Sequence, residues 1–187
     1  MGDRANVCLG TSEDGGSCCA VKFYHANEAD EQRALAEDEC KNWETAYRRQ
    51  ACFAMAYALD VAGGHCLVMP YLHPVKPEER LRLLDSGEIR NALEAFAESG
   101  FIHVEMQWRH IHIWRGKEES RIFIIDLENW SLKRCTNEVV VGKWIKRSIK
   151  HLRKTAKTKR KKNKQKNEQR IKHRRNSNQP NILLVLA

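Results

Sequence analysis

The eight residues from His103 to His110, HVEMQWRH, lie between two segments whose secondary structure the sequence indicates clearly. Upstream, apolar residues recur at helical spacing from a capping Ser86 to Gly100, which is expected to end that helix. Downstream, two β-rich runs flank the polar loop RGKEES, which predicts a hairpin over residues 111–127. We therefore expect residues 101–108, FIHVEMQW, to form a short turn or strand between the helix and the hairpin.

The chain before this stretch predicts a small sheet and one helix. Two short strands, 7–10 and 17–24, flank an acidic, Gly-containing turn. A helix signal follows, with Asn27 as its cap and acids in the first turn, and it ends near Arg49. Residues 51–72 read as strand, turn and strand, because Gly63 and Gly64 interrupt an apolar run. With the helix and hairpin downstream, the predicted fold class is α+β.

The charge of the chain is divided between an acidic body and a basic end. The chain has 187 residues and a formal net charge of +9. Residues 143–175 hold 17 Lys or Arg and one acid, Glu168, so they carry +16 and the rest carries −7. We expect a helix over about 141–154 that passes into a disordered basic tail. The plainer interpretation of that tail is a solvated end without a partner.

Composition also excludes two classes. The seven cysteines are odd in number and scattered without CxxC pairs, which argues against a disulfide framework. No apolar stretch approaches membrane-spanning length, so we expect no membrane partner.

Four short motifs occur in an order that resembles protein kinases. Ala20-Val21-Lys22 matches the strand whose Lys pairs with nucleotide phosphates and with a Glu on the next helix. LVMPYL, residues 67–72, stands where the adenine-binding hinge would be, and HVEMQWRH stands at the catalytic loop H-R-D-L-x-x-x-N. Ile124-Ile125-Asp126-Leu127-Glu128 stands at the strand whose Asp holds Mg²⁺.

The stretch HVEMQWRH and the motifs around it resemble one group of kinase-like domains in particular. MPYL with a Pro-containing connector, H-x-E-M-Q-W-R-H and the later D-L resemble the divergent kinase-like domains of Crinkler-type effectors of oomycetes and fungi, over about residues 5–130. The resemblance implies a kinase-like domain over 1–134, with a small lobe of antiparallel sheet plus one helix over about 1–72 and a partial, truncated large lobe over about 73–134. Residues 135–187 would form the basic helix and tail.

The resemblance also implies a function and a set of site residues. ATP and Mg²⁺ would be the cofactors, and an active protein would be an ATP-dependent Ser/Thr kinase; a pseudokinase is the equal alternative. Glu105, Asp126 and Lys22 would be catalytic, with Asp126 holding the metal. The nucleotide-binding residues would be Lys22, Glu39 (preferred over Glu37 and Glu44), Met69, Tyr71, His110 and Asp126.

Several departures from the kinase pattern weaken the expected chemistry. Glu105 replaces the catalytic Asp and places its carboxylate about 1.5 Å further out, one C–C bond. A misplacement of about 1 Å can cost on the order of 100-fold in rate. Gln107 removes a positive charge near the transferred phosphate, His110 replaces the Asn that holds the second metal, and Glu128 replaces a Gly. The loop GTSEDGG places Glu13 and Asp14 where phosphates would lie.

The expected partners follow from the same two regions. A protein partner, a dimer or the helix start Val139–Leu152 would cover the surface that a truncated large lobe leaves exposed. The basic run within 143–175 resembles a nuclear localisation signal or a nucleic-acid patch, so an import receptor or nucleic acid would bind there. The expected location is the nucleus, a host nucleus for a secreted effector, and otherwise the cytoplasm. The alternative function is a non-enzymatic, nucleic-acid-associated protein that acts through this tail.

Structural interpretations stand beside these functional ones. Lys22 would be a solvated charge at a strand end, and Asp126 would cap the following turn. Glu105 would pair with Arg109 at the surface. Trp108 and Trp114 are expected in the core, and the three histidines 103, 110 and 112 lack the spacing of a zinc site.

Overall fold

In the computed structural model, the predicted first strands form an antiparallel hairpin of β1 (Ala5–Thr11) and β2 (Cys18–Tyr24). The hairpin belongs to a four-stranded sheet in the order β1-β2-β4-β3, completed by β3 (Tyr57–Val61) and β4 (Gly64–Pro70). The structure describes residues 5–11, 18–25, 28–48, 56–61, 64–116 and 119–177, with side chains after Thr158 described only at Gln169. Glu13, Asp14, Asn27 and Gly63, which the sequence analysis singled out, lie outside these residues.

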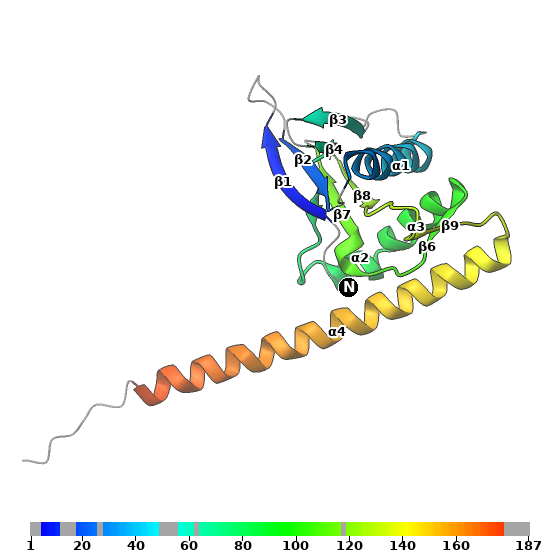
Figure 1. Ribbon diagram of the computed structural model, residues 1–187. Helices are drawn as coiled ribbons and strands as arrows, with labels where there is room; N and C mark the ends of the chain where they lie inside the picture. Colours follow the sequence, from blue (N-terminus) through cyan, green and yellow to red (C-terminus); the bar gives the residue numbers. More distant parts are fainter. Residues whose placement is uncertain are drawn as a thin grey trace, which may run out of the picture.

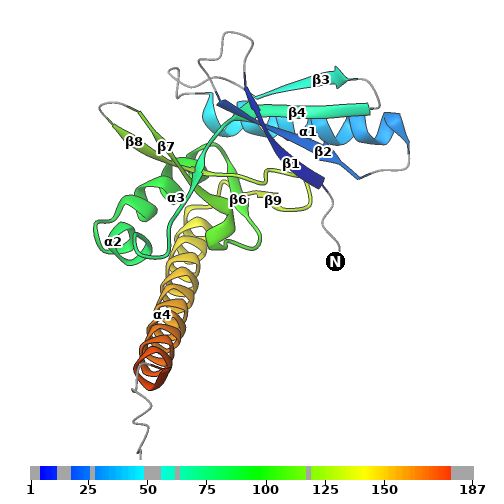
Figure 2. The same cartoon turned by 90° about the vertical axis from the view of Figure 1, so that its left-hand side faces the viewer.

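The helix α1 (Ala29–Tyr47) packs against this sheet, as Figures 1 and 2 show. Its N-cap is Glu28, and Asp30 and Glu31 occupy the first turn, where the helix dipole favours acids. Three side chains of α1 also bond the segment 124–127. The Glu39 carboxylate accepts from Leu127 N at 3.0 Å, the Asn42 amide donates to Leu127 O at 2.8 Å, and the Tyr47 hydroxyl bonds both backbone groups of Ile124.

A second group of elements follows β4. The strands β5 (His73–Pro74), β7 (Ile111–Arg115) and β8 (Ser120–Ile124) form a sheet in the order β5-β7-β8, which includes the predicted hairpin. The helices α2 (Arg80–Asp85) and α3 (Glu88–Glu98) lie beside it (Figure 2). The stretch 103–110 ends β6 (Phe101–His103) and includes the short 3-10 helix η1 (Trp108–His110).

Several elements and one cap differ from the sequence prediction, among them β5, which lies in the expected connector. Ser86 does not cap α3: it ends α2, and Gly87, in a left-handed conformation with φ of 83°, is the N-cap of α3. Helix α2 was not predicted, since its six residues are too few for a periodic pattern to be recognised. Strand β9 (Leu132–Arg134), which pairs with β6, was not predicted either, because three residues of mixed polarity carry no alternation signal.

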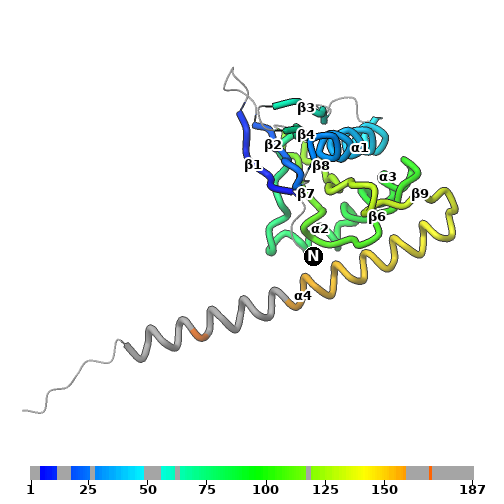
Figure 3. The backbone as a smooth tube through the Cα atoms, in the orientation of Figure 1, coloured from blue at the N-terminus to red at the C-terminus, as the bar shows by residue number. Residues whose placement is uncertain are grey.

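The last helix, α4 (Glu138–Ser177), begins against the body (Figure 3) and continues well beyond it (Figure 1). Trp144, Ile145, Leu152 and Ala156 are buried where α4 packs on α2 and α3. The helix is longer than predicted: residues 155–177, expected to be a disordered tail, are helical. No Gly or Pro occurs in 143–177, and Lys, Arg, Gln and Glu all have high helix propensity.

One continuous core joins these elements. The Tyr47 ring lies 5.0 Å from Phe123 and 6.5 Å from Phe96, and Phe96 lies 6.4 Å from Trp144, measured between ring centroids. These contacts connect α1, β8, α3 and α4. Among the described cysteines all are free, and only Cys66 is buried. No helix in the described part of the chain is both long and apolar enough to cross a membrane.

Candidate functional site

Lys22 is the centre of a buried charge cluster. It lies on β2 opposite Val7 of β1 and Leu67 of β4, so its side chain shares the sheet face that α1 covers. The residue is 6% exposed. A solvated charge at a strand end, the structural interpretation of Lys22, is therefore wrong.

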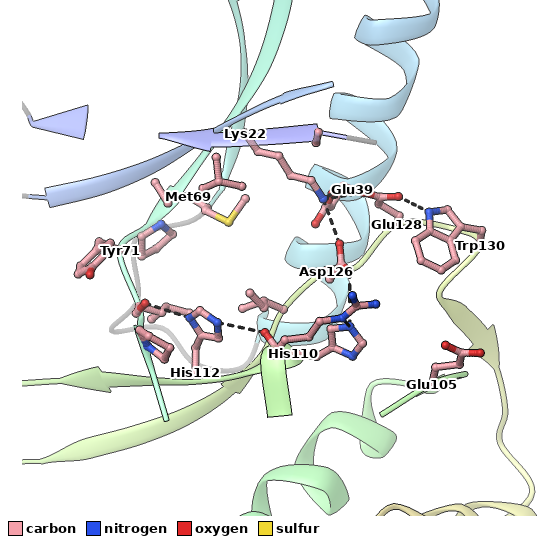
Figure 4. A pocket seen from close by; sticks show the side chains of 18 residues that line it. Lys22, Glu39, Met69, Tyr71, Glu105, His110, His112, Asp126, Glu128 and Trp130 are labelled. Atoms are coloured by element: carbon pink, nitrogen blue, oxygen red, sulfur yellow. Dashed lines mark hydrogen bonds and ion pairs between the residues drawn. The ribbon is translucent and has the colours of Figure 1, made fainter. Parts of the chain in front are cut away.

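Three carboxylates surround the Lys22 ammonium (Figure 4). Nζ lies 2.7 Å from Glu39 Oε2 on α1, 3.2 Å from Asp126 Oδ1 and 2.6 Å from Glu128 Oε1. Glu39 and Glu128 are buried, whereas the Asp126 side chain is 27% exposed. The preferred acid on the predicted helix, Glu39, is thus the one that reaches Lys22.

The electrostatics of the cluster favour the charged lysine. Burial alone would lower the pKa of Lys22, but the charges of Glu39, Asp126 and Glu128 outweigh it and raise that pKa above its ordinary value. Burial, together with the Glu39 carboxylate, also raises the pKa of Tyr24, whose hydroxyl donates to Glu39 Oε2 at 2.6 Å. One ammonium faces three carboxylates, so the cluster keeps a formal excess of negative charge.

Asp126 has an unusual backbone. Its φ is 67°, in the left-handed region that favours Gly and that Asp and Asn tolerate better than other side chains. The Ser131 hydroxyl donates to Asp126 O at 2.6 Å and holds this turn. The Asp126 side chain points to Lys22, so the structural interpretation of Asp126 as a cap of the following turn does not hold. Strain of this kind persists where the surroundings impose it, and it gathers at functional sites.

Two buried histidines form the next layer. The rings of His103 and His110 lie 4.4 Å apart, and His110 Nε2 lies 3.7 Å from Asp126 Oδ2. Burial and the neighbouring His103 lower the pKa of His110 to about 4, and burial lowers the pKa of His103 as well. Both rings are therefore neutral at neutral pH.

The charge cluster lies at the wall of a cavity of about 580 Å³, within the range of ligand-binding pockets. The cavity has an apolar part, lined by Ala5, Val7, Ala20, Met69, Leu72 and Ile125. All the candidate residues from the sequence line this same cavity: Lys22, Glu39, Met69, Tyr71, Glu105, His110 and Asp126. They come from β2, α1, the end of β4, the stretch 103–110 and the segment after β8.

Among the acidic site residues predicted from the sequence, Glu105 is the one that lies outside the charge cluster. It is exposed and lies apart from the cluster of Lys22, Glu39, Asp126 and Glu128 (Figure 4). In the described part of the chain no ion pair joins Glu105 to Arg109, whose Nε instead donates to His110 Nε2 at 2.9 Å. The surface pair between Glu105 and Arg109 is therefore not formed. Trp108, by contrast, is buried as expected, and Trp114 packs against the core.

Three contributors to the site were not predicted as site residues. The sequence pattern marks Glu128 as a replacement for Gly whose carboxylate would join the metal site, either to repel phosphate or to act as a ligand, and it does not single out Tyr24 or Trp130. Tyr24 could have been found, because it stands two positions after Lys22 on a strand and shares its face. Trp130 donates from Nε1 to the Glu128 carboxylate and lines the cavity, an arrangement that depends on a loop and has no sequence signal.

The carboxylates of the cluster bear on metal binding. Among the described residues, no three His, Cys, Asp or Glu side chains are arranged to hold a metal ion. Mg²⁺ that accompanies a nucleotide needs fewer protein ligands, because one or two carboxylates suffice when phosphates and waters supply the other ligands. Asp126, part-exposed at the cavity, fits that smaller requirement, and Glu128 is a second carboxylate beside it.

The comparison with protein families gives a match. Residues 1–114 match a family described as a family of unknown function (DUF5898). The matched range is more than half of the chain and includes Lys22, Glu39 and His110, and it ends within β7, before Asp126. The comparison with curated proteins finds no match.

Proposed function

This chain belongs to the DUF5898 family of unknown function, and we propose that its body is a divergent, kinase-like nucleotide-binding domain. The kinase-like small lobe would be the sheet of β1 to β4 with α1, and the elements from β5 to β9 would be a partial large lobe. Its relation to Crinkler-type domains rests on the sequence motifs alone. Phosphotransfer by this domain would be weak or absent.

A single observation carries this proposal. The buried Lys22–Glu39 ion pair, at 2.7 Å, meets Asp126 at the wall of a largely apolar cavity. Buried ion pairs contribute little net stability, because desolvation opposes their attraction. A group with a shifted pKa beside specific charges in a cleft is a better reason for such a cluster. The apolar part would take the base, and the charged wall would take the phosphates with their metal.

The cofactors follow from the charge of the cluster. The carboxylates around Lys22 would repel a free triphosphate. A divalent cation would neutralise part of the negative charge of both the carboxylates and the triphosphate. Asp126, joined by Glu128, would hold Mg²⁺, which would neutralise phosphate charge when bound. We therefore propose ATP with Mg²⁺ as the ligand.

Phosphotransfer has less support than nucleotide binding. Glu105 lines the cavity and is the carboxylate available to orient a substrate hydroxyl, but no neighbour fixes its position by a hydrogen bond or ion pair in the described part of the chain. A positioned base contributes roughly 10²–10⁴-fold, and one that is not held in place contributes less. We propose a pseudokinase or a slow Ser/Thr kinase, with Glu105 as the base in the second case.

Thermal unfolding of the full chain with and without ATP and Mg²⁺ tests nucleotide binding. A ligand at about 100 times its dissociation constant that binds only the folded state stabilises that state by roughly 2.7 kcal/mol. The critical variant is Asp126→Asn, because Asn tolerates the left-handed backbone of Asp126 while it removes the carboxylate charge.

The matched control is Asp85→Asn, which removes a carboxylate that is 61% exposed on α2 and away from the cavity lining. If the site binds nucleotide, ATP with Mg²⁺ should raise the melting temperature of the wild type and of the control. The increase should be much smaller in the Asp126 variant. No shift in the wild type at millimolar nucleotide would refute the proposal.

A second candidate function rests on α4. Its basic segment is one continuous helix to Ser177 that holds most of the +16 charge of residues 143–175. Such a helix neutralises phosphates without reading bases, so we propose sequence-independent nucleic-acid binding that weakens with salt. The basic run also resembles a nuclear localisation signal, which an import receptor would read and which would direct the protein to the nucleus.

The test of α4 must spare its first half, since Trp144 and Leu152 belong to the core. Replacing every Lys and Arg between 159 and 166 by Gln keeps helix propensity and removes charge. The salt slope of RNA binding should fall by about 0.7–0.9 for each phosphate that the helix no longer neutralises. An unchanged slope would exclude this role for the segment.

A further inference from the structure

We propose that Arg109 binds the outermost phosphate of the nucleotide. The inference rests on the proposed nucleotide-binding function and adds to it a residue that distinguishes a triphosphate from shorter ligands. Arg109 comes from η1, lines the cavity and is exposed.

The charge of the cavity wall leads to Arg109. Among the described residues that line the cavity, Lys22 and Arg109 are the two Lys or Arg side chains. Lys22 already contacts three carboxylates within 3.2 Å. In the described part of the chain no carboxylate lies within 4.0 Å of the Arg109 guanidinium. An anionic group that enters the cavity therefore meets one cation without a carboxylate partner, and that cation is Arg109.

Within the residues that the structure describes, the Arg109 guanidinium makes one hydrogen bond, through Nε. Arg109 Nε donates to His110 Nε2 at 2.9 Å, and the His110 ring is buried. This bond leaves the two terminal amino groups of the guanidinium for another partner. Two parallel N–H donors match two oxygens of a phosphate, which is the geometry that makes Arg a phosphate-binding residue.

A chain of contacts places Arg109 relative to the charge cluster. Lys22 contacts Asp126, and Asp126 Oδ2 lies 3.7 Å from His110 Nε2, which in turn accepts from Arg109. Apart from the buried His110, exposure rises along this chain, from the buried Lys22 through the part-exposed Asp126 to the exposed Arg109. Phosphates that begin at Lys22 and Asp126 would therefore reach Arg109 last, toward solvent.

Gln107 cannot supply this charge. It stands where the kinase pattern has Lys, its side chain carries no charge, and as the N-cap of η1 its backbone oxygen accepts a hydrogen bond from His110 N at 3.0 Å. Arg109, two residues further on, compensates for the missing cation from a different position. This assignment makes Arg109 a ligand-binding residue and leaves His110 as the group that positions it.

Isothermal titration of the full chain with ATP, ADP and adenosine, each with saturating Mg²⁺, tests the inference. In Arg109→Ala the dissociation constant of ATP should rise by about ten-fold or more, since Ala cannot donate the two charge-assisted hydrogen bonds of the guanidinium. That of ADP should rise by less than about three-fold, and that of adenosine should stay within about two-fold of the wild type. In Arg109→Lys the dissociation constant of ATP should lie between those of the wild type and of Arg109→Ala, because an ammonium is a point charge without the two parallel donors of a guanidinium.

The matched control is Arg90→Ala, which removes a half-exposed Arg on α3 that does not line the cavity. It should leave all the dissociation constants unchanged. An ATP affinity that is unchanged in Arg109→Ala, or an equal loss for ATP and adenosine, would overturn the role of Arg109 while nucleotide binding stands. A wild-type protein that binds none of the ligands would refute the proposed function itself.

Discussion

Lys22 of β2 and Glu39 of α1, seventeen positions apart, form an ion pair of 2.7 Å in which both side chains are buried. The same Glu39 carboxylate accepts from the Tyr24 hydroxyl and from Leu127 N. One carboxylate thus connects β2, α1 and the segment after β8. The charge cluster therefore holds these elements together as well as forming a candidate ligand site. Substitutions that remove its charges should lower the stability of the fold.

Replacing Lys22 by Met should destabilise the protein strongly. The substitution keeps the apolar stem but leaves Glu39, Asp126 and Glu128 without their shared cation. Removing one partner from a buried ion pair costs about 3–5 kcal/mol. Urea unfolding followed by circular dichroism measures this change. Lys41→Met on α1, whose side chain is 70% exposed, should change the free energy of unfolding by less than about 1 kcal/mol.

Replacing Tyr47 by Phe should weaken the attachment of α1 to β8. The Tyr47 hydroxyl donates to Ile124 O at 2.5 Å and accepts from Ile124 N at 2.8 Å, and Tyr47 is buried. Leaving buried backbone groups without a partner costs about 1–3 kcal/mol, so chemical denaturation should show a loss of that size. The same change at Tyr57, which is 54% exposed, is the control. Equal effects at both positions would contradict this assignment.

The stability of the protein should depend on His110 below neutral pH. The pKa of His110 is about 4 in the folded protein, below its ordinary value of 6.5. As the pH falls through 6.5, the unfolded chain therefore takes up the proton first, and the folded state loses stability until the pH reaches about 4.

In His110→Gln this contribution is absent, so the fall in melting temperature between about pH 7.5 and pH 5 should be smaller than in the wild type. His112→Gln is the comparison, because His112 is only part-buried and bonds backbone oxygens. A fall of the same size in the wild type and in His110→Gln would exclude His110 as the source.

Truncating Leu152 to Ala should destabilise the body, although the residue belongs to the basic helix. Leu152 is fully buried, and its carbonyl accepts from Trp108 Nε1 at 2.9 Å. A buried Leu replaced by Ala costs roughly 2–5 kcal/mol. Thermal unfolding should show this loss, whereas His151→Ala on the exposed side of the helix should not. A negligible effect of Leu152→Ala would mean that α4 is not part of the folded core.

Features of the fold that depend on the residue pattern of a single helix or strand could be predicted from the sequence. Apart from β5, α2 and β9, the order of strands and helices followed from local signals, and the spacing of Lys22 and Glu39 selected the acid on α1 that contacts Lys22. Glu128 and Trp130 were harder, since their roles come from a turn whose path depends on the left-handed backbone of Asp126. Strand β9 exists because β6 offers a pairing edge, which no local pattern of Leu132–Arg134 reveals. The predicted end of α4 was wrong because high charge indicates disorder, although the same residues are good helix formers.

The bonds between α1 and the segment 124–127 restrict how this protein could be regulated. Glu39, Asn42 and Tyr47 hold the inner side of α1 to Leu127 and Ile124 over two turns. A swing of the helix that carried Glu39 away from Lys22 would break all of these bonds together. An on–off switch by helix rotation would therefore have to break four hydrogen bonds as well as the Lys22–Glu39 pair. Control of access at the exposed rim of the cavity would leave all of them in place.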